Sequence, residues 1–222
     1  MNLKNILVGI EGIKAKGDIN IEINSVKNDS RKVEKGDLFI SIKGYEADGA
    51  DYIGDAIEKG AIAVLVEEGT NLKELKIKED TTLIVVPDSR KAMAQIACNY
   101  YDNPSRKFQL IGITGTKGKT TTTYMVKSML EKKGLKVGLI GTIRNYIGAE
   151  SLGDSQRTTP ESLELQEIFA KMAEAKCDVV IMEVSSQSLK LNRVYGSDFN
   201  IGIFTNLSEE HISEKEHADM KE

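Results

Sequence analysis

The chain lacks tryptophan and contains little proline, cysteine or aromatic residue. Among its 222 residues there are three prolines and two cysteines, Cys98 and Cys177, which lie far apart in the sequence. Small secreted domains that depend on disulfides use many more cysteines, so we expect both thiols to be reduced and structural. Because 40% of the residues are hydrophobic, we expect a conventional buried core to hold the fold together.

The chain also lacks long apolar runs and any concentration of positive charge. No stretch approaches the roughly 18 apolar residues of a membrane span, and no apolar segment with a cleavage site begins the chain. The formal net charge is −4, with Lys and Arg scattered among acidic residues, which argues against nucleic acid as a partner. We therefore expect a cytoplasmic protein that binds neither membranes nor nucleic acid, with a monomer favoured.

The first part of the chain predicts a small α/β domain over residues 1–104. Short segments rich in β-branched residues predict strands at 38–42, 62–66 and 83–86. Helical spacing of apolar residues predicts helices at 52–60 and 88–101. The polar turn Asp102-Asn103-Pro104 follows, and we expect the domain boundary there.

The second part, residues 105–222, predicts a doubly wound, mostly parallel α/β domain. Apolar segments predict strands at 108–114, 136–140, 178–184 and 199–205. One helix is expected to run from a glycine-rich turn to about Lys133. A second is expected to run from an N-cap at Thr159 to about Ala175. Alternation of strands and helices favours a sheet with helices on its faces.

The strongest motif, ITGTKGKTT, lies between the strand at 108–114 and the following helix. Glycines allow backbone N–H groups to face a phosphate chain, Lys119 can reach its terminal oxygens, and Thr120 can bind Mg²⁺. The generic motif G-x-x-x-x-G-K-[ST] would place its first glycine at position 113, which is Ile, and Gly115 takes its place. The motif predicts a nucleoside triphosphate site that uses Mg²⁺.

Several polar residues follow predicted strands on the rim where this loop opens. Glu183 ends one strand and His211 follows another, so the two could share a metal ion. An acidic residue at a strand end is common in P-loop proteins, and a single histidine is often structural. Arg193 and the pair Thr158-Thr159 lie in connections on the same side and could bind a carboxylate or a diphosphate.

Four segments together carry a family resemblance. The chain contains GTKGKTT at 115–121, TTPE at 158–161, MEVSSQSLKLNRV at 182–194 and TNLSEEH at 205–211. This combination resembles the Mur ligases, and among them the MurE type, which adds the third amino acid of the peptidoglycan stem. The segment NDSRKVEKGDLFISIKGYEADGADYIGDAIEKGAIAVLV also resembles the domain that binds the uridine diphosphate of the substrate.

The resemblance implies an ATP-dependent amide ligase in peptidoglycan synthesis. ATP would phosphorylate the terminal carboxylate of UDP-N-acetylmuramoyl-L-Ala-D-Glu, and an incoming amino acid would attack the acyl phosphate. Catalysis would depend on positioning and on neutralising charge, with Mg²⁺ as the metal. The partners would be the UDP-N-acetylmuramoyl-dipeptide and an amino acid, and the sequence does not identify that amino acid.

The resemblance also assigns residues to roles. ATP would be held by Gly115, Thr116, Lys117, Gly118, Lys119, Thr120 and Thr121. Mg²⁺ would be held by Thr120, Glu183 and His211, and catalysis would use Lys119, Glu183 and His211. The muramoyl-dipeptide would be held by Thr158, Thr159, Ser185 and Arg193, and the uridine diphosphate by Ser30 with Tyr45 nearby.

The chain departs from the family pattern at three positions and ends early relative to it. Gln187 replaces a usual histidine, Glu210 a usual aspartate and Glu46 a frequent glutamine, so altered detail is expected. The rest of the central domain and an amino-acid-binding domain would follow Glu222, so this fragment should not complete catalysis alone. Two alternatives are another Mur-type ligase, MurF-like or cyanophycin synthetase-like, and a non-catalytic nucleotide-binding module.

Overall fold

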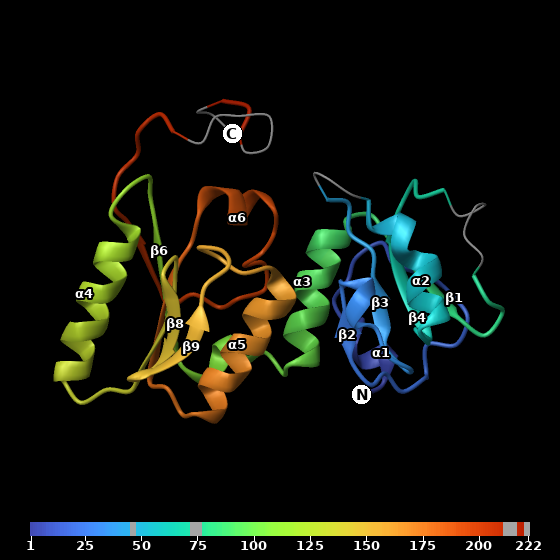
Figure 1. The fold of residues 1–222 in the computed structure, drawn as a ribbon, viewed down its shortest axis with the longest axis horizontal. Coiled ribbons are helices and arrows are strands. Elements are labelled where there is room, and N and C mark those ends of the chain that lie inside the picture. The colour runs from blue at the N-terminus through green and yellow to red at the C-terminus, as the bar shows by residue number, and fades with distance from the viewer. Residues whose placement is uncertain (45–47, 72–76, 211–216, 220–222) are drawn as a thin grey trace. The chain divides into compact units, whose positions relative to one another are not determined.

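The computed structural model describes residues 1–44, 48–71, 77–210 and 217–219, and the chain divides into two compact units (Figure 1). The first unit is Met1–Tyr100 and the second is Tyr101–Glu222, whereas the sequence places the boundary after Pro104. The short 3₁₀ helix η3 (Pro104–Lys107) packs against α5 (Ser162–Glu174) of the second unit. Each unit has its own sheet.

The first unit contains a five-stranded sheet in the order β1-β5-β4-β3-β2. The strands are β1 (Lys14–Lys16), β2 (Val26–Lys27), β3 (Leu38–Ile40), β4 (Ala63–Glu67) and β5 (Thr82–Val86). Strands β2 to β5 pair in parallel, and β1 pairs with β5 antiparallel. The three predicted strands are confirmed. The edge strands β1 and β2 escaped prediction because they are short and carry no apolar alternation.

Helices pack on the first sheet through alternate strand residues. They are α1 (Leu3–Ile6), η1 (Ser30–Lys32), η2 (Gly49–Tyr52), α2 (Ile53–Glu58) and α3 (Ser89–Tyr100). Phe39 and Val64 lie in one buried cluster with Ile53 and Ile57 of α2, as expected for residues that share a sheet face. Helix α3 packs against β4, and it begins where Asp88 Oδ1 accepts a bond from the Lys91 amide at 2.9 Å.

The second unit contains a six-stranded sheet in the order β11-β6-β10-β7-β8-β9. The strands are β6 (Gln109–Thr114), β7 (Val137–Ile140), β8 (Arg144–Ile147), β9 (Glu150–Asp154), β10 (Val179–Glu183) and β11 (Ile201–Phe204). The first four in this order pair in parallel, and β8 and β9 add an antiparallel hairpin at one edge. The mostly parallel sheet is confirmed, whereas the hairpin was not predicted.

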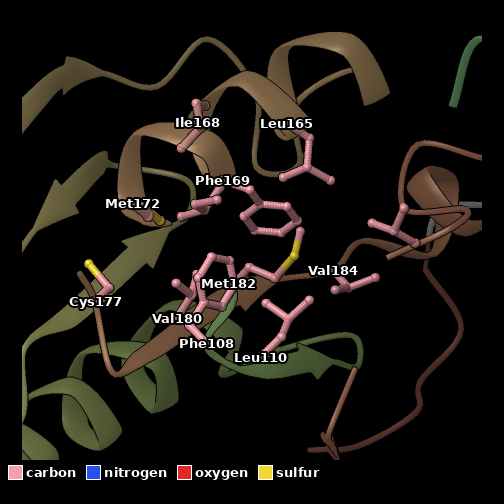
Figure 2. Packing of buried hydrophobic residues seen from close by; sticks show 12 residues of the cluster. Phe108, Leu110, Leu165, Ile168, Phe169, Met172, Cys177, Val180, Met182 and Val184 are labelled. Carbon is pink, nitrogen blue, oxygen red and sulfur yellow. The ribbon is translucent and has the colours of Figure 1, made fainter. Parts of the chain in front are cut away.

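Helices cover both faces of the second sheet, which confirms the doubly wound prediction. Val180 and Met182 of β10 pack with Phe169 of α5 on one face (Figure 2). The rings of Phe108 and Phe169 meet edge to face there, with their centroids 5.5 Å apart. On the other face, Ile181 packs in a cluster that includes half-buried side chains from α4 (Lys119–Lys132).

One predicted helix start is wrong. Helix α5 begins at Ser162 with Glu161 as its N-cap residue, two residues after the predicted cap at Thr159. The hydroxyl of Thr159 does not cap the helix because it donates to the carbonyl oxygen of Glu183 at 2.9 Å. This bond ties the start of the α5 segment to the end of β10.

The two cysteines and the helix lengths agree with the expectations from composition. Cys98 and Cys177 are buried and form no disulfide, as predicted. Burial raises the pKa of the Cys177 thiol, which keeps that side chain protonated and unreactive. Among the described residues, none of the helices is both long and apolar enough to span a bilayer.

Candidate active site

The loop Gly115–Gly118 joins the end of β6 to the start of α4. Its two glycines are needed for different reasons. Gly118 is the N-cap residue of α4 with φ +86°, and a Cβ there would meet open space. Gly115 has φ +131°, and a Cβ would collide with the Thr205 hydroxyl and come within 2.8 Å of the Asn206 carbonyl oxygen. Gly115 is therefore required by close packing of the segment that follows β11.

That segment holds the loop through several hydrogen bonds. The Thr116 amide donates to the Asn206 carbonyl at 3.0 Å, and the Lys117 amide donates to Asn206 Oδ1 at 3.0 Å. Asn206 Nδ2 and Thr205 Oγ1 both donate to the Lys117 carbonyl, at 3.0 and 2.8 Å. The loop is thus fixed from one side by the residues that follow the neighbouring strand.

Lys119 folds back over the loop. Its Nζ donates to the Gly115 carbonyl at 2.6 Å and to the Thr116 carbonyl at 3.1 Å. Two neutral carbonyl oxygens leave the ammonium charge uncompensated, since neither carries a full negative charge. The arrangement places a positive charge against the loop, beside the N-terminus of α4.

Glu183 is a fully buried carboxylate at the end of β10. Its Oε2 accepts bonds from the hydroxyls of Thr120 at 2.9 Å and Thr142 at 3.0 Å, and its Oε1 accepts from the Thr142 amide at 3.0 Å. Burial of a carboxylate is costly unless its oxygens are hydrogen-bonded. These bonds join the start of α4, the segment after β7 and the end of β10.

The oxygens of Thr120 and Glu183 suit Mg²⁺. This ion prefers oxygen ligands and is commonly held by one or two carboxylates together with water and phosphate oxygens. Within the described residues, no three His, Cys, Asp or Glu side chains gather as a metal cluster. The hydroxyl and carboxylate pair fits a metal that takes its other ligands from a bound phosphate chain. His211, the third predicted ligand, lies outside the described residues.

Tyr124 lies one helical turn after Thr120 in α4 and packs against Tyr146 of β8. The rings of Tyr124 and Tyr146 meet edge to face with centroids 6.3 Å apart. Burial raises the pKa of Tyr124 above its usual value, and Tyr146 and the negative charge of Glu183 raise it further. Tyr124 therefore stays neutral at physiological pH and adds no negative charge beside the carboxylate.

The predicted substrate residues Thr158, Thr159 and Ser185 lie close to Glu183 and Thr142. Thr159 is fully buried, and its hydroxyl accepts a bond from the Ser185 amide at 3.1 Å in addition to its bond with β10. The Thr158 and Thr142 hydroxyls share a hydrogen bond at 3.1 Å, in which Thr158 is the donor because Thr142 gives its one hydroxyl hydrogen to Glu183. The three residues are brought together, and the bonds of Thr159 favour a role in holding its neighbours.

Arg193 joins the same group. Its side chain is largely buried, its Nη1 donates to the Thr159 carbonyl at 3.3 Å, and its Nη2 lies 2.9 Å from Glu161 Oε1. A buried arginine needs a carboxylate and hydrogen-bond acceptors around it. Glu161 supplies the carboxylate, so the guanidinium is held in one place beside Thr159.

Two protein-family models match the chain. Residues 113–222 match the Mur ligase middle domain, and residues 22–101 match the Mur ligase family, catalytic domain. The chain belongs to the Mur ligase family. The resemblance seen in the sequence motifs of this Mur ligase chain is therefore confirmed.

Two curated relatives are diaminopimelate ligases. The chain is 53% identical over 212 residues to UDP-N-acetylmuramoyl-L-alanyl-D-glutamate–2,6-diaminopimelate ligase 1 of Clostridium acetobutylicum, covering 96% of this chain and 43% of that protein. It is 49% identical over 222 residues to the corresponding ligase of Clostridioides difficile, covering 100% and 44%. This Mur ligase chain thus spans less than half the length of the relatives it matches.

A solved structure shares the fold. A UDP-N-acetylmuramoyl-L-alanyl-D-glutamate–2,6-diaminopimelate ligase superposes with a TM-score of 0.77 at 24% identity, over 96% of this chain and 42% of that one. The two mostly parallel sheets are therefore the known Mur ligase architecture.

The predicted uridine residues of this Mur ligase chain lie in the first unit. Ser30 begins η1 and is buried, and its carbonyl accepts a bond from Lys59 Nζ at 2.9 Å. Asp29 caps this turn and accepts two bonds from the Arg31 guanidinium, both at 2.9 Å. Arg31 holds the pKa of Asp29 down at about 2. Tyr45 and Glu46 lie outside the described residues.

Sequence reasoning missed three residues of this Mur ligase site. Thr142 supplies two of the bonds to Glu183, Asn206 holds the loop, and Glu161 pairs with Arg193. Thr142 and Asn206 are small polar residues just after predicted parallel strands, which is the position where such folds place ligand sites. That placement was a usable signal, whereas the pairing of Glu161 required the structure.

Proposed function

We propose that this chain works in an ATP-dependent ligase that joins an amino acid to UDP-N-acetylmuramoyl-L-alanyl-D-glutamate in peptidoglycan synthesis. The observation that carries the proposal is the convergence of Lys119, Thr120 and Glu183 at the ends of neighbouring parallel strands. Relatives at about 50% identity carry the same activity in their names. Their names also specify 2,6-diaminopimelate, and we propose this amino acid as the substrate of the whole ligase to which the chain belongs.

Lys119 would stabilise the charge that moves during phosphoryl transfer. The loop would receive the phosphates of ATP, and Lys119 would exchange its two carbonyl partners for phosphate oxygens. Phosphoryl transfer leaves the protein little covalent work, so positioning and charge neutralisation dominate catalysis. The dipeptide carboxylate would attack the γ-phosphorus and release ADP, and the amine of the amino acid would then displace phosphate to give the amide.

Thr120 and Glu183 would hold Mg²⁺, with His211 as a further ligand. The bound ion would neutralise charge on the phosphate oxygens. To serve it, the Thr120 hydroxyl would turn its hydrogen away from Glu183, so that both oxygens face the metal. Thr142 would keep the carboxylate in place through its amide, because that bond does not occupy Oε2.

The muramoyl-dipeptide would lie beside Thr158, Ser185 and Arg193, with Thr159 holding these residues in position. Arg193 is suited to a carboxylate because its guanidinium presents parallel donors in a fixed plane. The uridine diphosphate would bind the first unit at Ser30 and Tyr45.

The direct test is amide formation by the whole ligase with Lys119→Ala. Loss of the ammonium that folds back over the loop should lower the rate by about 10³-fold or more. Lys132→Ala, at the exposed far end of the same helix, is the matched control and should keep the wild-type rate. Assays with diaminopimelate and with lysine identify the amino acid. Wild-type turnover by a folded Lys119→Ala protein would overturn the proposal.

A further inference from the structure

Asn206 bonds to the phosphate loop through its backbone carbonyl and through both polar atoms of its side chain. Its backbone carbonyl accepts from the Thr116 amide, its Oδ1 accepts from the Lys117 amide, and its Nδ2 donates to the Lys117 carbonyl, all at 3.0 Å. The side-chain oxygen of Asn206 faces the Lys117 N–H, and its side-chain nitrogen faces the Lys117 carbonyl. The side chain therefore fits the Lys117 backbone in one orientation only. Neither partner is adjacent to Asn206 in the sequence, since it follows β11 and they follow β6.

These bonds decide which way the loop amides point. The amides of Thr116 and Lys117 are directed at Asn206, so they do not face a nucleotide. The Lys117 carbonyl also points toward the segment after β11, where Thr205 Oγ1 donates to it as well. In a planar trans peptide the carbonyl and the following N–H point in opposite directions. The Gly118 amide must therefore point away from Asn206.

We propose that Asn206 is a positioning residue that orients the Gly118 amide toward the phosphates of ATP without touching the nucleotide itself. The inference rests on the proposed ATP-dependent function. The left-handed conformation of Gly118, with φ +86°, continues the same turn into the first amides of α4. Asn206 would thus determine the shape of the cradle, while Lys119 supplies its charge.

Gly115 makes this arrangement possible. A Cβ at this position would collide with Thr205 and crowd both the amide nitrogen and the carbonyl oxygen of Asn206, at 3.0 and 2.8 Å. The segment after β11 could not then approach closely enough for the Asn206 side chain to reach Lys117. Gly115 and Asn206 therefore depend on each other although they are distant in the sequence. Their neighbours Thr114 and Thr205, which are 91 residues apart, are also hydrogen-bonded.

The test measures MgATP binding and steady-state kinetics of the whole ligase with Asn206→Ala and Asn206→Asp. Asn206→Ala removes both side-chain bonds and should raise the KM for ATP roughly tenfold, the size expected for one or two neutral hydrogen bonds. Asn206→Asp is isosteric but sets a second acceptor against the Lys117 carbonyl, so its effect should be at least as large. The KM for the UDP-linked substrate should not change in either variant, and circular dichroism should show that both proteins are folded.

Ser208→Ala is the matched control in the same segment. Ser208 contacts Thr116 through its backbone amide and carbonyl, at 2.9 and 3.3 Å, so its side chain can be removed without loss of these bonds. Its KM for ATP should equal that of wild type. Unchanged ATP binding in Asn206→Ala, with wild type binding normally, would overturn the positioning role alone. Failure of the wild-type ligase to bind MgATP would overturn both this role and the proposed function.

Discussion

Among the described residues, each unit buries one carboxylate deeply, and the two have different partners. Asp37 of the first unit is 2% exposed, and its Oδ2 accepts from the amide of Glu34, three residues earlier. Glu183 of the second unit is 0% exposed and accepts from Thr120 and Thr142, which lie 63 and 41 residues away in the sequence. Asp37 closes a turn, whereas Glu183 joins three separate segments.

The difference in partners supports the proposal that Glu183 serves a binding site, whereas Asp37 serves the fold. In a turn, a nearby backbone amide donates to the carboxylate, and this local bond is enough to satisfy it. Thr120 and Thr142 offer Glu183 hydroxyl groups, which can reorient and release it to another partner such as a metal. Buried polar networks that link distant segments are costly to assemble, so they are found where a site requires them.

The largest expected effect separates these two carboxylates directly. Glu183→Gln keeps the size of the side chain but removes its charge, so amide formation by the whole ligase should fall by about 10²-fold to 10³-fold. Asp37→Asn should leave the rate unchanged, because its oxygen can still accept from the Glu34 amide. The rate of amide formation is measured for both variants. Equal losses of rate would show that Glu183 and Asp37 do not differ in role.

A smaller effect is expected from the loop glycines. Gly115→Ala introduces both a clash with the segment after β11 and a strained backbone, so it should lower the free energy of unfolding by about 2–3 kcal/mol. Gly118→Ala adds only the left-handed strain in open space and should cost about 1 kcal/mol. Thermal unfolding of both proteins gives the two values. A larger loss in Gly118→Ala would contradict the close packing at Gly115.

The first unit should respond to a different ligand from the second. Ser30→Ala should weaken the binding of a uridine nucleotide by roughly tenfold, because a hydrogen bond to a charged group is lost. The Lys59 bond to the Ser30 carbonyl is retained in this variant. Calorimetry with a uridine nucleotide and with ATP measures both effects, and we expect the affinity for ATP to be unchanged. An unaltered uridine affinity would remove Ser30 from that site.

The smallest effect concerns the pH dependence of stability in the first unit. The pKa of Asp29 falls from 3.8 to about 2 in the folded protein because Arg31 binds the charged form. The stabilisation is complete above the unfolded pKa and is lost as the pH falls through about 2. Arg31 is 85% exposed, so the contribution should stay below about 1 kcal/mol. Urea unfolding measures this contribution at pH values from roughly 2 to 5, which span the folded and unfolded pKa values. In Asp29→Asn, the pH-dependent stabilisation by Asp29 should be absent.

Sequence reasoning succeeded where periodic burial determines structure. The strands β3 to β7 and β10 are mostly apolar and buried, and the three long helices repeat apolar residues at helical spacing. Strand β11 is also apolar, although most of it is exposed. The hairpin of β8 and β9 was missed because it lies at the sheet edge, and all five residues of β9 are exposed. Edge strands gain their order from backbone pairing, which leaves little trace in the side chains.

The candidate site was predictable in its residue types and less so in its bonds. The loop motif is recognisable because it lies between a strand and a helix, and Glu183 because it ends a buried strand. Thr159 shows the limit, since a Thr-Pro pair predicts a helix cap and the hydroxyl instead bonds to β10. Local sequence favours local bonds, and a partner from a distant strand can replace them only when the fold is complete.

The folded-back Lys119 has a consequence for how nucleotide affinity should be understood. Its ammonium already has two oxygen partners inside the protein, at 2.6 and 3.1 Å. Binding of a phosphate chain is then an exchange of oxygens and not the capture of a freely hydrated cation. The loop carbonyls take the place of phosphate oxygens around Lys119, so the contribution of this lysine to affinity would be the difference between the two kinds of oxygen. In the proposed ligase, this exchange would let the site select for the charge of a phosphate chain and still release ADP after each turnover.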